Sequence, residues 1–269
     1  MKKMICISIA ILAAGNSGNS QDRHFGRLYD TPTLPKGGFD IEIWNTYRAG
    51  RENLYNRLDQ RAEFEVGLTD KLQTAIYLNG SHRTTAVVKP SVAGEDSVVS
   101  LTKSSSFSFS NEWKYNIADP SLNPFGFALY GEYTLAAHEI ELEGKLLFDK
   151  RTEKNIFAAN IVGEYEMEFE AEAGEVEMAK ETVFENGLGY MFMVKPSLGF
   201  GIELRNHNEI VKGEWEHATL FAGPTLFFSN DKFFLILNLL PQLDDLTARS
   251  INLDEHEKFE VRLFVGFGL

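Results

Sequence analysis

The last eleven residues of the chain alternate strictly between two kinds of side chain. Six apolar residues share one face: Phe259, Val261, Leu263, Val265, Phe267 and Leu269. Polar and small residues, with one phenylalanine, fill the other: Glu260, Arg262, Phe264, Gly266 and Gly268. A period of two places neighbouring side chains on opposite faces of a β-strand. An exposed edge strand invites aggregation, whereas closure into a barrel removes the edge. This segment therefore favours a closed β-barrel that ends on its last strand.

The same alternation recurs from Phe39 onward and defines about twelve strands. After the first twenty residues no apolar run reaches the 18 residues expected of a transmembrane helix. The fold class predicted is an all-β, transmembrane, antiparallel up-and-down β-barrel over residues 38–269. The alternative is a soluble β-sandwich, which also alternates. Large aromatic residues on the apolar face favour the membrane barrel. Residues 218–240 are apolar on both faces, so their register stays open.

The connections predicted between these strands alternate in length, as they do in bacterial barrels whose two termini face the periplasm. Short turns rich in Asp, Asn, Pro and Lys are expected at Thr69–Lys71, Ala118–Pro124, Lys150–Asn155, Val194–Pro196 and Asn230–Lys232. Loops at the opposite end, most of them longer, are expected at Ala49–Leu58, His82–Lys103, Ala136–His138, Ala173–Glu181, Asn206–His217 and Leu243–Lys258.

The N-terminus has the pattern of a secretory signal peptide over residues 1–20. Lys2 and Lys3 precede a short apolar run from Met4 to Ala14, and small residues follow it. Cleavage would remove Cys6, which is the only cysteine. Residues 21–37 are expected to form an irregular periplasmic leader, and the sequence leaves open whether they plug the pore. These features predict the outer membrane of a Gram-negative bacterium.

The net charge of −13 excludes nucleic acid as a partner, because phosphates need a basic face. The partners expected instead are outer-membrane lipid, the barrel-assembly machinery acting on the C-terminal strand, and possible small solutes.

Several short motifs resemble an uncharacterised outer-membrane β-barrel family that is similar to outer-membrane transporters annotated near aromatic-degradation pathways. They are Thr33-Leu-Pro-Lys-Gly-Gly, Glu65-Val-Gly-Leu-Thr-Asp, Leu129-Tyr-Gly-Glu-Tyr and Glu141-Leu-Glu-Gly-Lys-Leu. The terminal Phe267-Gly-Leu269 resembles the signal read by the barrel-insertion machinery, although the commonest form ends in Phe or Trp. The resemblance implies a barrel and provides no substrate.

Charged residues occupy the polar face of many strands and are therefore predicted to line the lumen. These candidates are Glu63, Glu112, Lys114, Glu132, Glu141, Glu143, Lys145, Glu164, Glu166, Glu203, Arg205, Glu260 and Arg262. Acidic rings select for cations. The predicted function is a narrow channel or passive transporter for a small solute or cation. In the alternative, these charges only brace a closed barrel that has a structural or surface role.

A lipid-modifying enzyme is a further alternative, since such an enzyme needs a serine activated by histidine. The histidines after the signal all fall in the predicted leader or loops: His24, His82, His138, His207, His217 and His256. Ser81 and His82 are adjacent on a strand and point to opposite faces. No Gly-x-Ser-x-Gly motif is present. We therefore expect no catalytic, cofactor or metal site.

Overall fold

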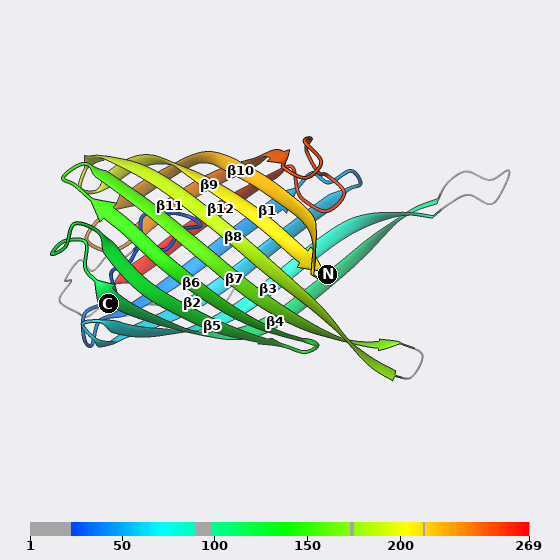
Figure 1. The fold of residues 1–269 in the computed structure, drawn as a ribbon, viewed down its shortest axis with the longest axis horizontal. Coiled ribbons are helices and arrows are strands. Elements are labelled where there is room, and N and C mark those ends of the chain that lie inside the picture. The colour runs from blue at the N-terminus through cyan, green and yellow to red at the C-terminus, as the bar shows by residue number, and fades with distance from the viewer. Residues whose placement is uncertain (1–22, 90–97, 173–174, 212, 269) are drawn as a thin grey trace, which may run out of the picture.

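A computed structural model describes residues 23–89, 98–172, 175–211 and 213–268. Each strand pairs antiparallel with its neighbours along the chain, and β1 pairs with β12 to close the barrel (Figure 1). The predicted all-β, antiparallel up-and-down barrel of about twelve strands is confirmed. Its strands are β1 (Phe39–Ala49), β2 (Tyr55–Thr69), β3 (Leu72–Lys89), β4 (Val98–Ala118), β5 (Gly126–Ala136), β6 (Glu139–Arg151), β7 (Asn155–Glu172), β8 (Glu175–Lys195), β9 (Leu198–Val211), β10 (Glu214–Ser229), β11 (Phe234–Asp245) and β12 (Phe259–Gly268).

The barrel has two different ends. At the turn end, β1 begins, β12 ends, and residues 70–71, 119–125, 152–154, 196–197 and 230–233 connect the strands, close to the predicted turns. The opposite end, called the loop end, holds residues 50–54, 137–138 and 246–258.

Three of the long loops predicted at the loop end are wrong over most of their described length. The β3–β4 pairing continues to Lys89↔Val98, the β7–β8 pairing to Glu172↔Glu175, and the β9–β10 pairing to Val211↔Glu214. The β3–β4 and β7–β8 ribbons extend beyond the barrel wall in Figure 1. Polar residues dominate at 82–85, 100–106 and 206–217, so the apolar pattern does not mark strands there, but the paired backbones satisfy each other's hydrogen bonds. Residues 90–97 and 173–174 lie outside the described parts of these loops.

The strands point the way their alternation predicts. On β12, Glu260, Arg262 and Phe264 are buried, while Leu263 is 38% exposed on the outside. Large apolar side chains form an outer belt on all twelve strands; members include Ile43, Phe64, Ile76, Trp113, Leu129, Leu142, Phe157, Leu188, Phe200, Leu226, Leu237 and Leu263. Within the residues that the structure covers, no helix is long and apolar enough to cross a membrane.

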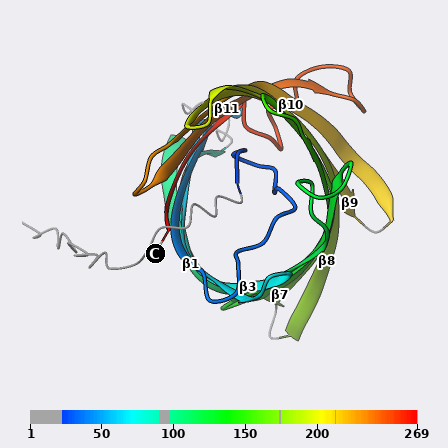
Figure 2. The ribbon, with the colours of Figure 1, turned by 90° about the vertical axis from the view of Figure 1, so that its left-hand side faces the viewer.

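Residues 23–34 lie inside the barrel, and the exposed residues Pro35 and Lys36 follow them at the turn end. We call residues 23–36 the plug. Figure 2, viewed from the turn end, shows it as a blue trace within the ring of strands. Its apolar side chains Phe25, Leu28, Tyr29 and Leu34 are all buried. The sequence leaves open whether this segment plugs the pore. In the described residues it does enter the barrel and fills part of the interior.

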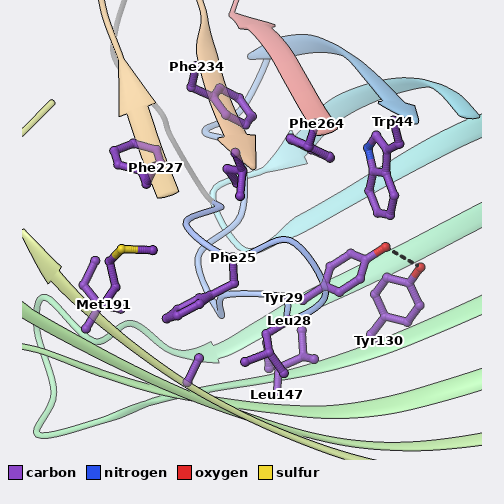
Figure 3. Packing of buried hydrophobic residues seen from close by; sticks show 14 of the residues in the cluster. Phe25, Leu28, Tyr29, Trp44, Tyr130, Leu147, Met191, Phe227, Phe234 and Phe264 are labelled. Atoms are coloured by element: carbon purple, nitrogen blue, oxygen red, sulfur yellow. Dashed lines mark hydrogen bonds between the residues drawn. The ribbon is translucent and has the colours of Figure 1, made fainter. Parts of the chain in front are cut away.

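The plug also explains why β10 and β11 are apolar on both faces. Phe227 of β10 and Phe234 and Ile236 of β11 point inward and join Phe25 and other plug residues in one buried cluster (Figure 3). Their outward neighbours belong to the wall's apolar face. The register that the sequence leaves open at residues 218–240 is therefore fixed by packing against the plug.

Candidate functional site

Glu203 of β9 is the main anchor of the plug. Its carboxylate accepts hydrogen bonds from the backbone N–H groups of Gly26 (2.7 Å) and Arg27 (2.8 Å). Thr225 and Asn238, on the neighbouring strands, donate to the same carboxylate at 2.5 Å and 3.1 Å. Glu203 is only 1% exposed. A buried carboxylate is tolerated where several donors satisfy it, so this residue ties the plug to β9, β10 and β11.

Arg27 adds an ion pair between the plug and β12. Its Nε donates to Glu260 at 2.6 Å, and its Nη2 contacts the second carboxylate oxygen. Arg48 of β1 shares the same carboxylate at 3.1 Å. Arg262 donates to the backbone oxygen of Gly26 at 2.9 Å. Charge-assisted bonds of this kind are the stronger ones in proteins, and they join the plug to the seam that closes the barrel.

The opposite side of the plug is held by β4, β6 and β7. Asn160 binds both backbone groups of Tyr29, at 2.7 Å and 3.0 Å. Asn116 donates to the backbone oxygen of Thr31 at 2.7 Å, and the Thr31 hydroxyl donates to Asp149. The backbone of the plug therefore pairs with wall side chains in place of a strand, as buried peptide groups require.

The N-terminal part of the plug brings an arginine into an acidic and aromatic environment. The Arg23 guanidinium stacks 3.9 Å from the centre of the Tyr29 ring and 4.4 Å from that of Trp44. Its Nη1 lies 4.0 Å from Glu42. Arg23 and Glu42 are both almost fully buried. Cation–π contact and ion pairing together suit a buried guanidinium.

Two glycines of β8 make room for the plug. A Cβ atom on Gly189 would lie 2.5 Å from Leu28 and 2.7 Å from Phe25, and one on Gly187 would also collide with Leu28. Only glycine therefore lets the wall approach these two plug side chains. Figure 3 shows Phe25 and Leu28 packed among Met191, Leu147 and Tyr29.

Above the plug, toward the loop end, the barrel encloses a cavity of about 570 Å³. Arg27, Leu28 and Tyr29 form its floor. Its lining includes twelve carboxylates and eight Lys or Arg side chains, so acids outnumber bases. A volume of this size suits a small ligand or a group of hydrated ions.

The charges in the cavity are segregated around the wall. Eight of the twelve carboxylates, all of them glutamates, lie on β5 to β8, whereas the arginines lie on β1, β2, β9, β12, the plug and residues 50–54. On the acidic side, glutamates stand directly opposite one another in two rows across neighbouring strands: Glu132, Glu143 and Glu164 in the first, and Glu141, Glu166 and Glu181 in the second.

Opposed like charges on neighbouring strands cost stability. Lys145 offsets part of this cost by pairing with Glu143 at 2.9 Å, and Arg61 does so with Glu132 at 3.4 Å. Within the described residues no lysine or arginine forms an ion pair with the second row, so water or mobile cations would screen it.

All thirteen residues predicted for the lumen lie on the inward side of their strands. Seven line the cavity together with Arg262: Glu132, Glu141, Glu143, Lys145, Glu164, Glu166 and Arg205. Arg262 also joins Glu203 and Glu260 in holding the plug. The remaining three, Glu63, Glu112 and Lys114, are buried below the cavity.

The sequence analysis missed a group of three histidines and expected no metal cluster. The structure brings together His207 of β9, His217 of β10 and His256 of the β11–β12 loop. Burial, together with the neighbouring His207, His217 and Arg205, lowers the pKa of His256 to about 2. The polar sequence of residues 206–217 predicts a loop and so hides the strand positions of His207 and His217, and no local pattern places His256 beside them.

The family model described as "Family of unknown function (DUF6662)" matches residues 17–269. No curated protein matches the chain. Among solved structures, the chain resembles the COG4313 outer membrane channel from Pseudomonas putida F1, with 12% identity, a TM-score of 0.59, and coverage of 89% of this chain and 98% of that one.

Two further solved structures resemble the chain. The translocator domain of the autotransporter NalP from Neisseria meningitidis has 10% identity and a TM-score of 0.58, over 86% of this chain and 88% of that one. The NanC porin has 9% identity and a TM-score of 0.54, over 85% and 100%. At such low identity these likenesses establish a shared fold.

Proposed function

We propose that this chain, which belongs to the Family of unknown function (DUF6662), is an outer-membrane channel that passes a small solute or cation through an acidic lumen and is narrowed at its turn end by the plug. The observation that carries the proposal is the charged cavity of about 570 Å³ inside a closed barrel with an apolar outer belt. A barrel that served only as a scaffold would fill this space with packed side chains.

The membrane part of the proposal rests on the belt and on the shared fold. Large apolar side chains exposed around a whole barrel fit contact with lipid. Of the solved structures that the chain resembles, one is described as an outer membrane channel, one as a porin and one as an autotransporter translocator domain. A signal peptide over residues 1–20 would deliver the chain to a Gram-negative outer membrane; that segment lies outside the described residues.

The selectivity part rests on the imbalance and segregation of charge in the cavity. Twelve carboxylates against eight Lys or Arg side chains favour cations. The rows of opposed glutamates would attract a cation or an ammonium group passing the β5–β8 wall. The arginines opposite would orient a solute that carries both charges. A cation or a small zwitterionic or polar solute is thus the cargo class that fits best.

Conductance in a planar bilayer tests this function. Refolded protein under a potassium chloride gradient should give discrete current steps whose reversal potential indicates cation preference. Protein that is inserted and heat-modifiable yet electrically silent would instead favour a closed barrel with a structural or surface role, unless release of the plug restored current.

Neutralising Glu141 and Glu143 together, as Glu141→Gln and Glu143→Gln, should reduce the cation preference without preventing assembly. Both side chains line the cavity on the acidic wall, so their loss weakens its field. The reversal potential measures the change. Glu177→Gln is the control, because Glu177 is exposed on β8 outside the cavity lining. An unchanged reversal potential in the double variant would contradict an acidic selectivity wall.

We further propose that the barrel is not a lipid hydrolase. The strongest serine–histidine pair among the described residues is on the outer face, where His82 Nδ1 lies 2.8 Å from Ser105 Oγ. In that described part of the chain no carboxylate or amide contacts the other ring nitrogen of His82, and a hydrolase needs such an orienting partner. Release of fatty acid from phospholipid vesicles should be absent in wild type. Release that Ser105→Ala abolished would overturn this proposal.

A further inference from the structure

Three histidines from different parts of the chain meet at the loop end of the barrel interior. One ring nitrogen from each of His207, His217 and His256 lies within 4.8 Å of the other two. The ring centroids of His217 and His256 are 4.3 Å apart, and those of His207 and His256 are 5.4 Å apart. His217 is 3% exposed and His256 is 9% exposed. Imidazole nitrogens crowded together out of water are the usual ligands of divalent transition metals.

Carboxylates orient two of the rings from behind. Glu209 lies 2.8 Å from Nε2 of His217, and Glu185 lies 3.2 Å from Nδ1 of His207. Pairing of a ligand histidine with a carboxylate fixes its orientation and raises its basicity in metal sites. Arg205 is 3.1 Å from the same Nδ1 of His207, so that nitrogen is engaged with the wall and Nε2 is the one left for a ligand.

Three nitrogens of the cluster are buried without a hydrogen-bond partner. They are Nδ1 and Nε2 of His217 and Nε2 of His256. A buried polar atom without a partner costs stability unless a ligand satisfies it. An ion bound by three nitrogens at about 2.0–2.1 Å would draw them to roughly 3.4 Å apart, which small side-chain rotations can supply.

We propose that His207, His217 and His256 form a binding site for a divalent transition-metal ion of the zinc class, and that the ion tethers the β11–β12 loop to the barrel wall. Three histidines leave a fourth position for water or a solute. The surrounding acids Glu185, Glu209 and Asp245 would offset the positive charge of the ion. Arg205, which is also positive, would oppose that effect. The site is independent of the proposed channel, although its location gives it access to the cavity.

The tether follows from where the three ligands originate. His207 and His217 belong to the paired strands β9 and β10, whereas His256 belongs to residues 246–258. His207, His256 and the adjacent Glu255 and Glu257 line the cavity. An ion held by all three would therefore fix this loop at the cavity mouth.

Zinc titration of tag-free, chelator-treated protein in detergent tests the site. Calorimetry should show one ion per chain, and cobalt in place of zinc should give the visible absorption of a nitrogen-ligated ion. His256→Ala should weaken binding at least about 100-fold, since even outer partners of metal ligands contribute 10- to 100-fold. His82→Ala is the matched control, because His82 is exposed on β3 away from the cluster.

A second measurement keeps the result independent of folding. The His256 side chain belongs to a loop, so the variant barrel should remain heat-modifiable like wild type. Zinc should slow tryptic cleavage after Arg249 in wild type and leave it unchanged in His256→Ala. Absence of zinc binding in folded wild type, or equal affinity in the His256→Ala variant, overturns the site. Binding without protection of the loop overturns the tether.

Discussion

A variant that begins at Gly37, and so lacks the plug, should conduct at least several-fold more current than the full mature chain. The plug lies between the cavity and the turn end, where Phe25, Leu28 and Tyr29 pack inside the barrel and narrow the lumen (Figure 2, Figure 3). Without it, water should replace the buried contacts of Glu203 and Glu260 and join the cavity to the turn end. Single-channel recording in planar bilayers measures the effect.

A point variant can loosen the plug while the segment itself stays in the chain. Glu203→Ala removes the acceptor for the backbone of Gly26 and Arg27. Each donor left buried without a partner costs about 1–3 kcal/mol, so the plug should open more often and brief high-conductance events should appear. Glu181→Ala removes a cavity glutamate that forms no hydrogen bond or ion pair with the described plug residues, so it should not produce them. Identical traces from the variant lacking the plug and from wild type would show that the plug does not close the pore.

The barrel could be predicted because its strands obey a local rule. On β12, every outward residue is apolar and every inward one is polar, small or aromatic, so one strand is sufficient to set the facing. The ribbons beyond the wall could not be predicted in this way. There, Glu177 and Lys180 of β8 lie outside the apolar belt, and the pairing of this segment rests on backbone hydrogen bonds.

The contents of the lumen were harder to predict than its lining. The alternation along β9 and β12 places Glu203 and Glu260 on the inward face. Nothing near them in the sequence indicates that Gly26 and Arg27 are their partners. The useful signal was the inward apolar face of β10 and β11, which a water-filled lumen would not need. Such a face predicts that a further segment fills the barrel at that height.

Replacing Leu263 by arginine should destabilise the inserted barrel by about 2–4 kcal/mol, which is the cost of an arginine at the bilayer midplane. Leu263 is near the middle of β12, points outward, and pairs with the outward-facing Leu237. The charged head must leave hydrocarbon or draw water in, and either response weakens the wall. Urea unfolding in lipid vesicles, followed by tryptophan fluorescence, measures the free energy of unfolding.

Leu122→Arg is the matched control for this change, because it adds the same charge to an apolar residue outside the belt. Leu122 is 83% exposed in the 119–125 turn at the end of the barrel. Near the interface the cost of arginine falls to about 0–1 kcal/mol. Equal unfolding free energies for the two variants would mean that Leu263 does not face hydrocarbon, and the outer belt would then have to be covered by something other than lipid. A loss confined to Leu263→Arg supports a membrane-spanning wall at the strand that closes the barrel.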